Sequence, residues 1–254
     1  MRAGSILVRH CRGQAEFERC LELQVAVWGG VELDVVPLPV FVITPEMGGH
    51  VLGAFDGDRM IGFTLAFAGL HGLQPFLHSH MTAVLEPYRD RGVGRQLKMF
   101  QRQDALARGI HLVEWTFDPL ELRNAHFNIE RLGAIVRRFL PNHYGITSSP
   151  LHAGLPTDRL LAEWHLKSPR AEACAAGRGL SAARHPQAQR IAVPGNIGEL
   201  KRTDAAAAAE IQSHAREEFQ RWLGQDYVVT GMEKSGEGAS YILEPYASAK
   251  DLSA

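Results

Sequence analysis

The stretch Tyr88–Gly109, YRDRGVGRQLKMFQRQDALARG, places three arginines and two glycines within seven residues, directly before a helical pattern. Glycine lets the backbone approach a ligand closely, and the first turn of a helix leaves N–H groups without intrahelical partners. Those N–H groups and the helix dipole attract anions, and arginine side chains add charge-assisted hydrogen bonds. The pattern predicts a diphosphate site where a strand leads into a helix. A turn with solvated arginines is the alternative.

Two common phosphate motifs fit this stretch poorly. A Walker A loop needs Lys-Ser or Lys-Thr after its last glycine, whereas Gly94 is followed by Arg95 and Gln96. A dinucleotide-binding fingerprint needs three glycines as GxGxxG, and only GxG is present here.

Bulk composition limits the class of protein. The chain has 254 residues, of which 45% are hydrophobic and 22% charged, and this is an ordinary globular composition. Its 27 basic and 28 acidic residues give a net charge of −1, so no overall field attracts nucleic acid or a membrane surface. We therefore expect neither as a partner, and any anion must be bound by local arrangement.

The cysteines and the N-terminus indicate a cytoplasmic location. The three cysteines show no CxxC spacing, and an odd number without a secretory leader indicates reduced thiols. The N-terminus is too short and too charged for the apolar region of a signal peptide. No stretch approaches the roughly 20 apolar residues of a membrane span.

Hydrophobic periodicity and turn signals predict strands and helices in mixed order. We expect strands over 5–9, 50–56, 59–69, 77–84, 111–117, 134–140, 159–166, 190–193, 227–232 and 239–245, and helices over 14–28, 92–108, 122–132 and 204–222. The pair Asp56-Gly57 predicts a hairpin turn. Three prolines predict that 35–49 is a loop, and small, polar residues predict that 168–189 is an exposed connection. Hairpins together with βαβ units predict an α/β fold with a mixed sheet.

In its context, the RxxGxG pattern at Arg89–Gly94 resembles the signature of the GNAT superfamily of acyl-CoA-dependent N-acyltransferases. The context is the strand HSHMTAV, the turn LEPYRDRGVG, a helix, the strand LVEWTF and the helix NAHFNIERLGA. These stretches, with VAVWGG, GLPTDRLLAEWHL and WLGQDYVV, resemble a group of predicted GNAT acetyltransferases. The resemblance implies a GNAT-like fold with a splayed central sheet over 1–168, a connecting segment over 169–189 and a smaller C-terminal βαββ extension over 190–254.

The resemblance also implies an acyl-CoA co-substrate, with no metal. In the superfamily the pantetheine arm lies between the fourth and fifth strands and bonds to strand backbone like an added edge. The implied CoA-binding residues are Ala83 and Val84 for the pantetheine, Arg89, Arg91, Gly92, Val93, Gly94 and Arg95 for the pyrophosphate, and Asn124 and Asn128 for the pantetheine or the acyl carbonyl. The two asparagines lie four residues apart on one predicted helix face. Helix capping or solvent exposure is the alternative for them.

The implied reaction is direct attack of an amine on the thioester, which requires a base for the ammonium proton. Alternation places His78, His80, Thr82 and Val84 on one strand face, and Glu114, Thr116 and Asp118 on one face of the next strand. A base with a pKa near neutrality suits the task, so His80 is the first candidate and Glu114 the second. A buried structural histidine is the alternative.

The acid that protonates the departing thiolate is harder to assign. Many members carry a tyrosine four residues before the glycine that ends the last helix, where this chain has Ile129. Tyr144 is the nearby tyrosine that we expect to serve instead, with a packing role as the alternative.

The expected activity is transfer of an acetyl or another short acyl group to a small amine or amino acid, with succinyl transfer to an amino acid as one option. A protein amine is a further acceptor class, and the alternative function is a silent CoA-binding sensor. The segment 35–49, with Asp34 and Glu46, lies where the family recognises acceptors. Among the expected roles of the C-terminal extension are closing the acceptor site and contacting a second protomer in a homodimer.

Overall fold

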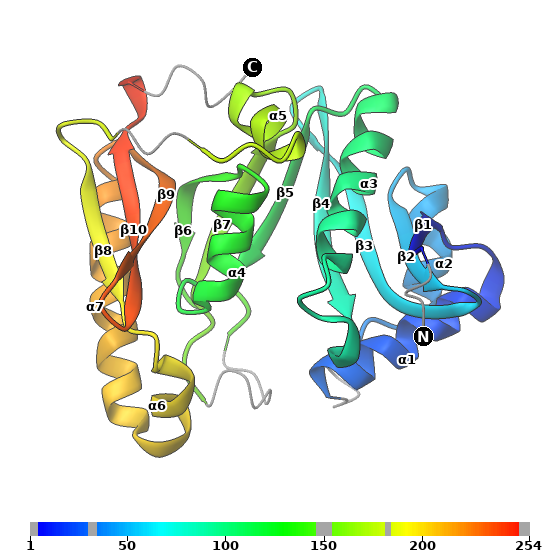
Figure 1. Cartoon of the computed structure of the whole chain (residues 1–254), viewed down its shortest axis with the longest axis horizontal. Helices are drawn as coiled ribbons and strands as arrows, with labels where there is room; N and C mark the ends of the chain where they lie inside the picture. The colour runs from blue at the N-terminus through cyan, green and yellow to red at the C-terminus, as the bar shows by residue number, and fades with distance from the viewer. Residues whose placement is uncertain (1–4, 30–34, 146–153, 181–183, 249–254) are drawn as a thin grey trace. The chain divides into compact units, whose positions relative to one another are not determined.

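The computed structural model of the chain describes residues 5–29, 35–145, 154–180 and 184–248 (Figure 1). Two compact units divide it, Met1–Glu114 and Trp115–Ala254, and the boundary falls within strand β5 (Leu112–Phe117). Each unit is treated by itself below. Asp34 lies outside the described residues.

The strands of the first unit follow one another in chain order as an antiparallel meander that ends beside the first residues of β5. They are β1 (Leu7–His10), β2 (His50–Asp56), β3 (Arg59–His71) and β4 (Gln74–Val84). The predicted hairpin turn is confirmed, with Gly57 at a φ of 58°. β3 and β4 run further toward their shared turn than their apolar patterns predicted, because backbone pairing continues through the polar residues there.

Helices cover both faces of this meander. They are α1 (Gly13–Trp28), α2 (Leu38–Glu46) and α3 (Val93–Ala107). Phe17, Cys20 and Phe41 from α1 and α2 pack in one core cluster with Phe63 and Leu65. Val93 and Leu97 from α3 pack in another, on Leu52 and Ile61. Val51 and Leu52 are neighbours in β2 and belong to the first and the second cluster respectively. Because neighbouring strand residues point to opposite faces, α3 lies on the face opposite α1 and α2.

The expectation of a loop over 35–49 is wrong, because α2 occupies most of it. Pro37 precedes the helix and Pro39 stands in its first turn, where the N–H that proline lacks would have no intrahelical partner. Pro45 enters only in the last turn, and Gly48 follows with a φ of 81°. The prolines therefore mark the two ends of a short helix.

A β-bulge in β4 corrects the predicted strand faces. Ser79 stands opposite Ala66 and Met81 opposite Leu65, so His80 is an extra residue with no counterpart in β3. Because side chains alternate with period two, one extra residue reverses the faces beyond it. Val84 accordingly packs with the α3 cluster, whereas His80 lies beside Phe67, which belongs to the α1 cluster. His80 and Val84 do not share a face.

The second unit holds the remaining strands in the order β5-β7-β6-β9-β10-β8. Its strands are β6 (Ile135–Leu140), β7 (Arg159–His165), β8 (Gln189–Val193), β9 (Tyr227–Ser235) and β10 (Gly238–Pro245), and its α-helices are α4 (Leu122–His126), α5 (Pro169–Ala175), α6 (Ile197–Thr203) and α7 (Ala205–Leu223). A π-helical turn, Phe127–Arg131, continues α4. Trp115 and Trp164 pack edge to face in the core, with ring centroids 6.1 Å apart.

The expectation of an exposed connection over 168–189 is wrong in its first part. Ser168 caps α5 by accepting a hydrogen bond from the Ala171 N–H, and Ala171 and Cys174 are buried. Arg170 donates to the carbonyl oxygens of Gly133 and Thr230, which fastens α5 to the core. The small residues Ala171 and Cys174 are therefore packed in the interior and are not part of an exposed loop.

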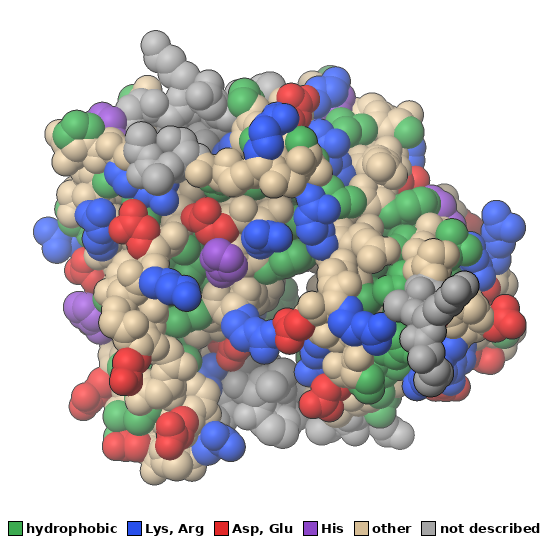
Figure 2. All heavy atoms as spheres, in the orientation of Figure 1, with side chains coloured by type: hydrophobic (Ala, Val, Ile, Leu, Met, Phe, Trp, Pro, Cys, Tyr) green, Lys and Arg blue, Asp and Glu red, His purple; other side chains and the backbone are tan. Residues whose placement is uncertain are grey.

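Charge is distributed without a single-sign patch on the face seen in Figure 2, where basic and acidic side chains are interspersed. Among the described helices, none combines the length and the apolar character that a membrane crossing requires.

Candidate active site

The arginine- and glycine-rich turn forms the N-terminus of α3. Gly92 precedes the helix with a φ of 80°, and no side chain caps the helix at this end. The first helical hydrogen bond runs from the Gln96 N–H to the Gly92 carbonyl. The N–H groups of Val93, Gly94 and Arg95 precede that bond, so the helix supplies no carbonyl for them. This end of α3 has the dipole and the donors of an anion site.

The two glycines leave space in front of those donors. A Cβ built on Gly92 or on Gly94 would meet no heavy atom within 4 Å. Asp90 also has a positive φ, of 60°. The turn thus keeps the backbone conformation that glycine favours at Asp90 and Gly92, and an approach to the helix end stays open.

The arginines of the turn are held close to it. The Arg89 Nε donates to the Val84 carbonyl at 3.2 Å, and the Arg91 guanidinium lies 5.1 Å from the Tyr88 ring centroid. Tyr88 is fixed by a hydrogen bond to Asp56 at 3.0 Å. Val93 is buried, so its contribution to a ligand would be its backbone N–H alone. Arg89 and Arg91 are exposed beside the helix end.

The strand before the turn stops pairing with β5 early. The parallel register between the described residues of β4 and β5 pairs Leu77 with Val113 and His78 with Glu114. Ala83 and Val84 lie five and six residues beyond His78 along β4 and are paired with β3 on the other side. Their backbone on the β5 side therefore has the character of an unpaired strand edge.

His80 sits on the bulge of β4 and is exposed. Its centroid is 5.1 Å from that of Phe67 and 6.2 Å from that of His78. Surrounding protein atoms partly desolvate the imidazole, which lowers its pKa below the ordinary value. The ring is therefore neutral at pH 7, as a general base must be.

Glu114 is buried and already has a partner. Its carboxylate lies 3.0 Å from the His71 Nε2, and the His71 ring stacks on Phe76 with centroids 4.1 Å apart. A carboxylate held in this way is less suited to accept a proton from an amine than the partly exposed His80.

In the second unit, the two predicted asparagines differ in environment. Asn124 is exposed, whereas Asn128 is 2% exposed and lies in the π-helical turn. The Nδ2 of Asn128 finds no hydrogen-bond partner in the described part of the chain. A buried amide without a partner is costly, and such groups in native structures commonly bind a ligand or water.

Tyr144 also belongs to the second unit and is half-exposed. Its hydroxyl lies 2.8 Å from the Thr116 Oγ1, on β5, and the Arg159 guanidinium lies 5.4 Å from its ring centroid. Ile129 is fully buried and packs in the core, so it offers no group to a thiolate. The roles of Tyr144 and of the other residues remain predictions.

The residues present fit an acyl-CoA. Within the first unit, the open glycines and the arginines match a pyrophosphate, and the edge of β4 beyond His78 matches a pantetheine amide. In the second unit, considered by itself, the Asn128 Nδ2 is a buried donor that can bond an acceptor of a ligand. Among the described residues, no cluster of three or more His, Cys, Asp or Glu is arranged to hold a metal.

One polar cluster in the first unit was missed by sequence reasoning. The apolar pattern of α3 predicted a face of Val93, Leu97, Phe100 and Ala107, but Ala107 is exposed and Lys98 and Gln101 are buried. A lysine and a glutamine in a helical pattern are ordinarily placed in solvent. Ser79 gives no signal of its own, because His78, His80 and Thr82 make the same strand polar at three other positions.

Comparison with known proteins agrees with this architecture. The model of the acetyltransferase (GNAT) family matches residues 17–134. No curated protein matches the chain.

Three solved structures resemble the chain in fold. The ribosomal-protein-S18-alanine N-acetyltransferase from Escherichia coli matches with a TM-score of 0.50 and 12% identity, over 71% of this chain and 97% of that one. A GNAT family acetyltransferase from Elizabethkingia anophelis with acetyl-CoA bound matches with 0.51 and 14%, over 63% and 98%. Arabidopsis thaliana Naa50, in complex with the bisubstrate analogue CoA-Ac-MVNAL, matches with 0.50 and 14%, over 63% and 97%. The expected mixed α/β fold of GNAT type is confirmed.

Proposed function

Because residues 17–134 match the model of the acetyltransferase (GNAT) family, we propose that the protein is an acyl-CoA-dependent N-acyltransferase. It transfers an acetyl or another short acyl group to a small amine or amino acid. The observation that carries the proposal is the open N-terminus of α3, where Gly92 and Gly94 leave space beside Arg89 and Arg91. That arrangement binds the diphosphate of CoA through backbone N–H groups and arginines.

The chemistry follows from the neutral His80. An ammonium acceptor gives its proton to the imidazole, and the amine lone pair then attacks the thioester carbonyl carbon. The carbon–sulfur bond breaks as the tetrahedral species collapses, and the thiolate takes a proton, for which Tyr144 is the candidate donor. The nitrogen, positively charged after its attack, gives up a second proton, which restores the Tyr144 hydroxyl and leaves a neutral amide. A positioned base contributes roughly 10²–10⁴-fold to such a step.

The lowered pKa of His80 predicts the pH range in which kcat decreases toward acid. Since burial lowers the pKa of His80 below the ordinary 6.5, the acidic limb of kcat should lie below pH 6.5. His80→Ala should lower kcat far more than it lowers CoA affinity, and it should remove that limb. A profile that keeps the limb in His80→Ala would exclude this histidine as the base.

The acceptor is the least defined part of the proposal. The Escherichia coli relative is named for a ribosomal-protein alanine and Naa50 was solved with a peptide-bearing analogue. A protein N-terminus therefore belongs in the test beside small amines.

The test combines binding with turnover. CoA, acetyl-CoA and succinyl-CoA are titrated calorimetrically into the protein, and thiol release is followed with D- and L-amino acids, polyamines and short peptides with a free N-terminus. Arg89→Ala and Gly94→Asp should abolish CoA binding, while Arg19→Ala, which removes an exposed arginine of α1 paired with Glu22, should not. Acceptor-dependent release identifies the transferase and its substrate class.

Two other outcomes would count against the proposal. Tight CoA binding without release from any acceptor would favour a silent CoA sensor. Absence of CoA binding would mean that the residues Arg89–Arg95 form only a solvated turn.

A further inference from the structure

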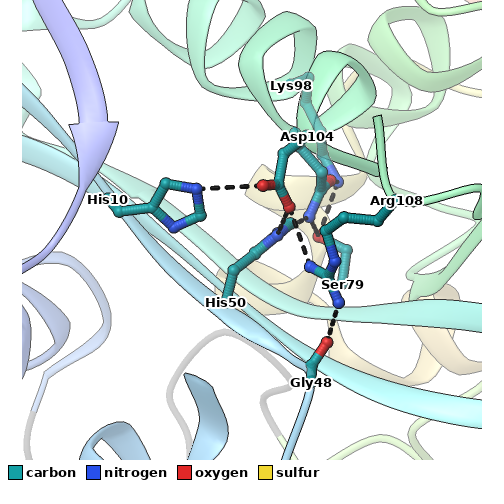
Figure 3. A network of polar contacts seen from close by, with 8 residues as sticks. His10, Gly48, His50, Ser79, Lys98, Asp104 and Arg108 are labelled. Carbon is teal, nitrogen blue, oxygen red and sulfur yellow. Dashed lines mark hydrogen bonds and ion pairs between the residues drawn. The ribbon is translucent and has the colours of Figure 1, made fainter. Parts of the chain in front are cut away.

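A lysine is buried between α3 and β4, in the polar network drawn in Figure 3. Lys98 and Ser79 are each 4% exposed, and Gln101 is fully buried. The Lys98 Nζ donates to the Ser79 Oγ at 2.8 Å and to the Gln101 Oε1 at 3.1 Å. The amide nitrogen of Gln101 also lies 3.3 Å from the Ser79 Oγ. Ser79 is therefore held by two side chains of α3.

The network continues outward through His50. The Gln101 Nε2 lies 2.9 Å from the His50 Nε2, and the His50 Nδ1 lies 2.9 Å from the Asp104 Oδ2. Asp104 is in turn bound by Arg108 at 3.0 Å and by His10 at 3.0 Å. Figure 3 shows these side chains converging from β1, β2, β4 and α3. Each of these hydrogen bonds either joins α3 to a strand or joins two side chains of α3 and its C-terminal end.

A buried polar network between a helix and a sheet costs free energy that apolar packing does not. Burying an amine costs free energy even when it is hydrogen-bonded, and apolar residues of similar volume commonly pack there at no loss of stability. Burial lowers the pKa of Lys98 to about 7, which reflects that cost. The buried lysine therefore indicates that its hydrogen bond to Ser79 serves to fix the geometry of Ser79 rather than to stabilise the fold.

Ser79 is the residue immediately before the bulge. It stands opposite Ala66, and Met81 stands opposite Leu65, so the extra residue between them is His80. Bulges re-aim the side chain that they carry. The hydroxyl of Ser79 points to α3, while the ring of His80 lies on the other face, beside Phe67. Anchoring Ser79 on one face therefore fixes the direction of His80 on the other.

We propose that Lys98 is a positioning residue, which holds the β4 bulge through the Ser79 hydroxyl and so directs the His80 imidazole. The inference rests on the proposed function in one respect, the role of His80 as base. It predicts that Lys98 and Ser79 act on the rate through His80, although neither reaches the reacting atoms.

The first test separates kcat from cofactor binding. Lys98→Met and Ser79→Ala should each lower kcat at least about 10-fold, because small misplacements of a reacting group cost up to roughly 10²-fold. The calorimetric Kd for CoA should change less than about 2-fold, since the turn Arg89–Arg95 is untouched. Ser79→Thr keeps the hydroxyl and should restore most of kcat. Ser168→Ala is the matched control, because it removes an equally buried serine hydroxyl, which bonds the His165 carbonyl at 2.8 Å in the second unit and not in β4.

A double-mutant cycle distinguishes positioning from a general loss of structure. In the His80→Ala background, Lys98→Met should lower the residual kcat less than about 2-fold, because the group that it positions is absent. An equal loss in both backgrounds, or no loss in the single variant, would overturn the inference.

Hydrogen exchange keeps the inference testable if the wild-type protein proves inactive, an outcome that would remove the proposed function alone. In Ser79→Ala and Lys98→Met the amides of residues 79–82 should exchange at least about 10-fold faster than in the wild type or Ser168→Ala, since the bulge opens more readily when its side-chain hydrogen bonds are lost. Unchanged exchange in these residues would show that neither side chain anchors the bulge, and would overturn the inference independently of any activity.

Discussion

At the residue scale, the buried amine of Lys98 couples protonation to folding. Its pKa falls from the ordinary 10.5 to about 7, because burial disfavours the ammonium form. In the unfolded chain the amine stays protonated until pH 10.5 is approached. Between these values the unfolded state binds more protons than the folded state, so stability must rise with pH. The nearby His50 is neutral, since burial lowers its pKa as well. Asp104 remains ionised: burial alone would raise its pKa, but hydrogen bonds from His50 and Arg108 outweigh it and lower the pKa.

The first prediction measures that coupling. Relative to Lys98→Met, the free energy of unfolding of the wild type should increase by about 1–2 kcal/mol from pH 7 to pH 8.5. Urea denaturation at a series of pH values gives the difference. His10, Asp104 and Arg108 are present in both proteins, so their contributions cancel to first order. A difference that stays flat over this range would mean that Lys98 is charged or exposed.

The second prediction separates the two glycines of the turn. Gly92 has a φ of 80°, whereas Gly94 lies in the helix, and both have open space at the Cβ position. Gly92→Ala should lower the free energy of unfolding by about 1 kcal/mol through backbone strain. Gly94→Ala should leave it unchanged or raise it by up to about 1 kcal/mol, because alanine favours helix.

Both alanines should nonetheless weaken CoA binding, because a methyl group would occupy the approach to the N–H groups. We expect a loss of roughly 10-fold or more, about 1.4 kcal/mol. Thermal melts and calorimetric titration of the same samples check stability and affinity separately. Wild-type affinity in Gly94→Ala would place the anion elsewhere than at this helix end.

At the element scale, turn signals and apolar patterns in the sequence predicted most strands and helices. The exceptions depend on contacts between elements that are far apart in the chain. The hairpin at Asp56-Gly57 and the helix beginning at Val93 were predictable because their turns and apolar patterns agree with their tertiary environment. α2 was not, because prolines that end a helix carry the same signal as prolines in a loop. The bulge in β4 was not predictable either, since the extra residue is defined by its partner strand, and His80 changes face without any change in local pattern.

The same limit applied to the candidate site. The turn Arg89–Arg95 was readable as a helix N-terminus because its glycines and arginines act through local backbone geometry. The contacts of Glu114 with His71 and of Lys98 with Ser79 were not readable, because each joins residues on separate elements. Polar side chains inside a packed interior are recognised only once their partners are placed beside them.

The third prediction concerns the start of α7, where Thr203 and Asp204 both have side chains that can cap a helix. The Asp204 carboxylate accepts a hydrogen bond from the Ala207 N–H at 3.0 Å, whereas the Thr203 hydroxyl donates to the Glu199 carbonyl in α6. Asp204→Ala should therefore cost about 1 kcal/mol of stability. Thr203→Ala, at an exposed site, should stay within about 0.5 kcal/mol of the wild type. Urea denaturation of the two variants measures both changes in the free energy of unfolding. A larger loss in Thr203→Ala would mean that Thr203, and not Asp204, caps α7.

At the scale of the whole molecule, the predicted CoA contacts fall in both compact units. The turn Arg89–Arg95 belongs to Met1–Glu114, and Asn128 belongs to Trp115–Ala254. A ligand that binds only the folded state stabilises it by about 2.7 kcal/mol at a hundredfold excess over Kd. If the ligand contacts residues of both units, amide exchange should slow in both upon CoA addition.

The fourth prediction uses the buried Nδ2 of Asn128, which has no hydrogen-bond partner in the described chain. Asn128→Leu removes an unsatisfied amide at nearly constant volume, so it should raise the free energy of unfolding of the ligand-free protein by about 1 kcal/mol. The same change should weaken CoA binding roughly 10-fold, because a hydrogen bond to the ligand is lost. It should also abolish CoA-dependent protection around residues 122–132 while leaving protection of 83–95 in place. Hydrogen exchange with and without CoA measures both regions in one experiment. If Asn128→Leu were more stable and bound CoA with unchanged affinity, the orphaned amide would have no part in the ligand site.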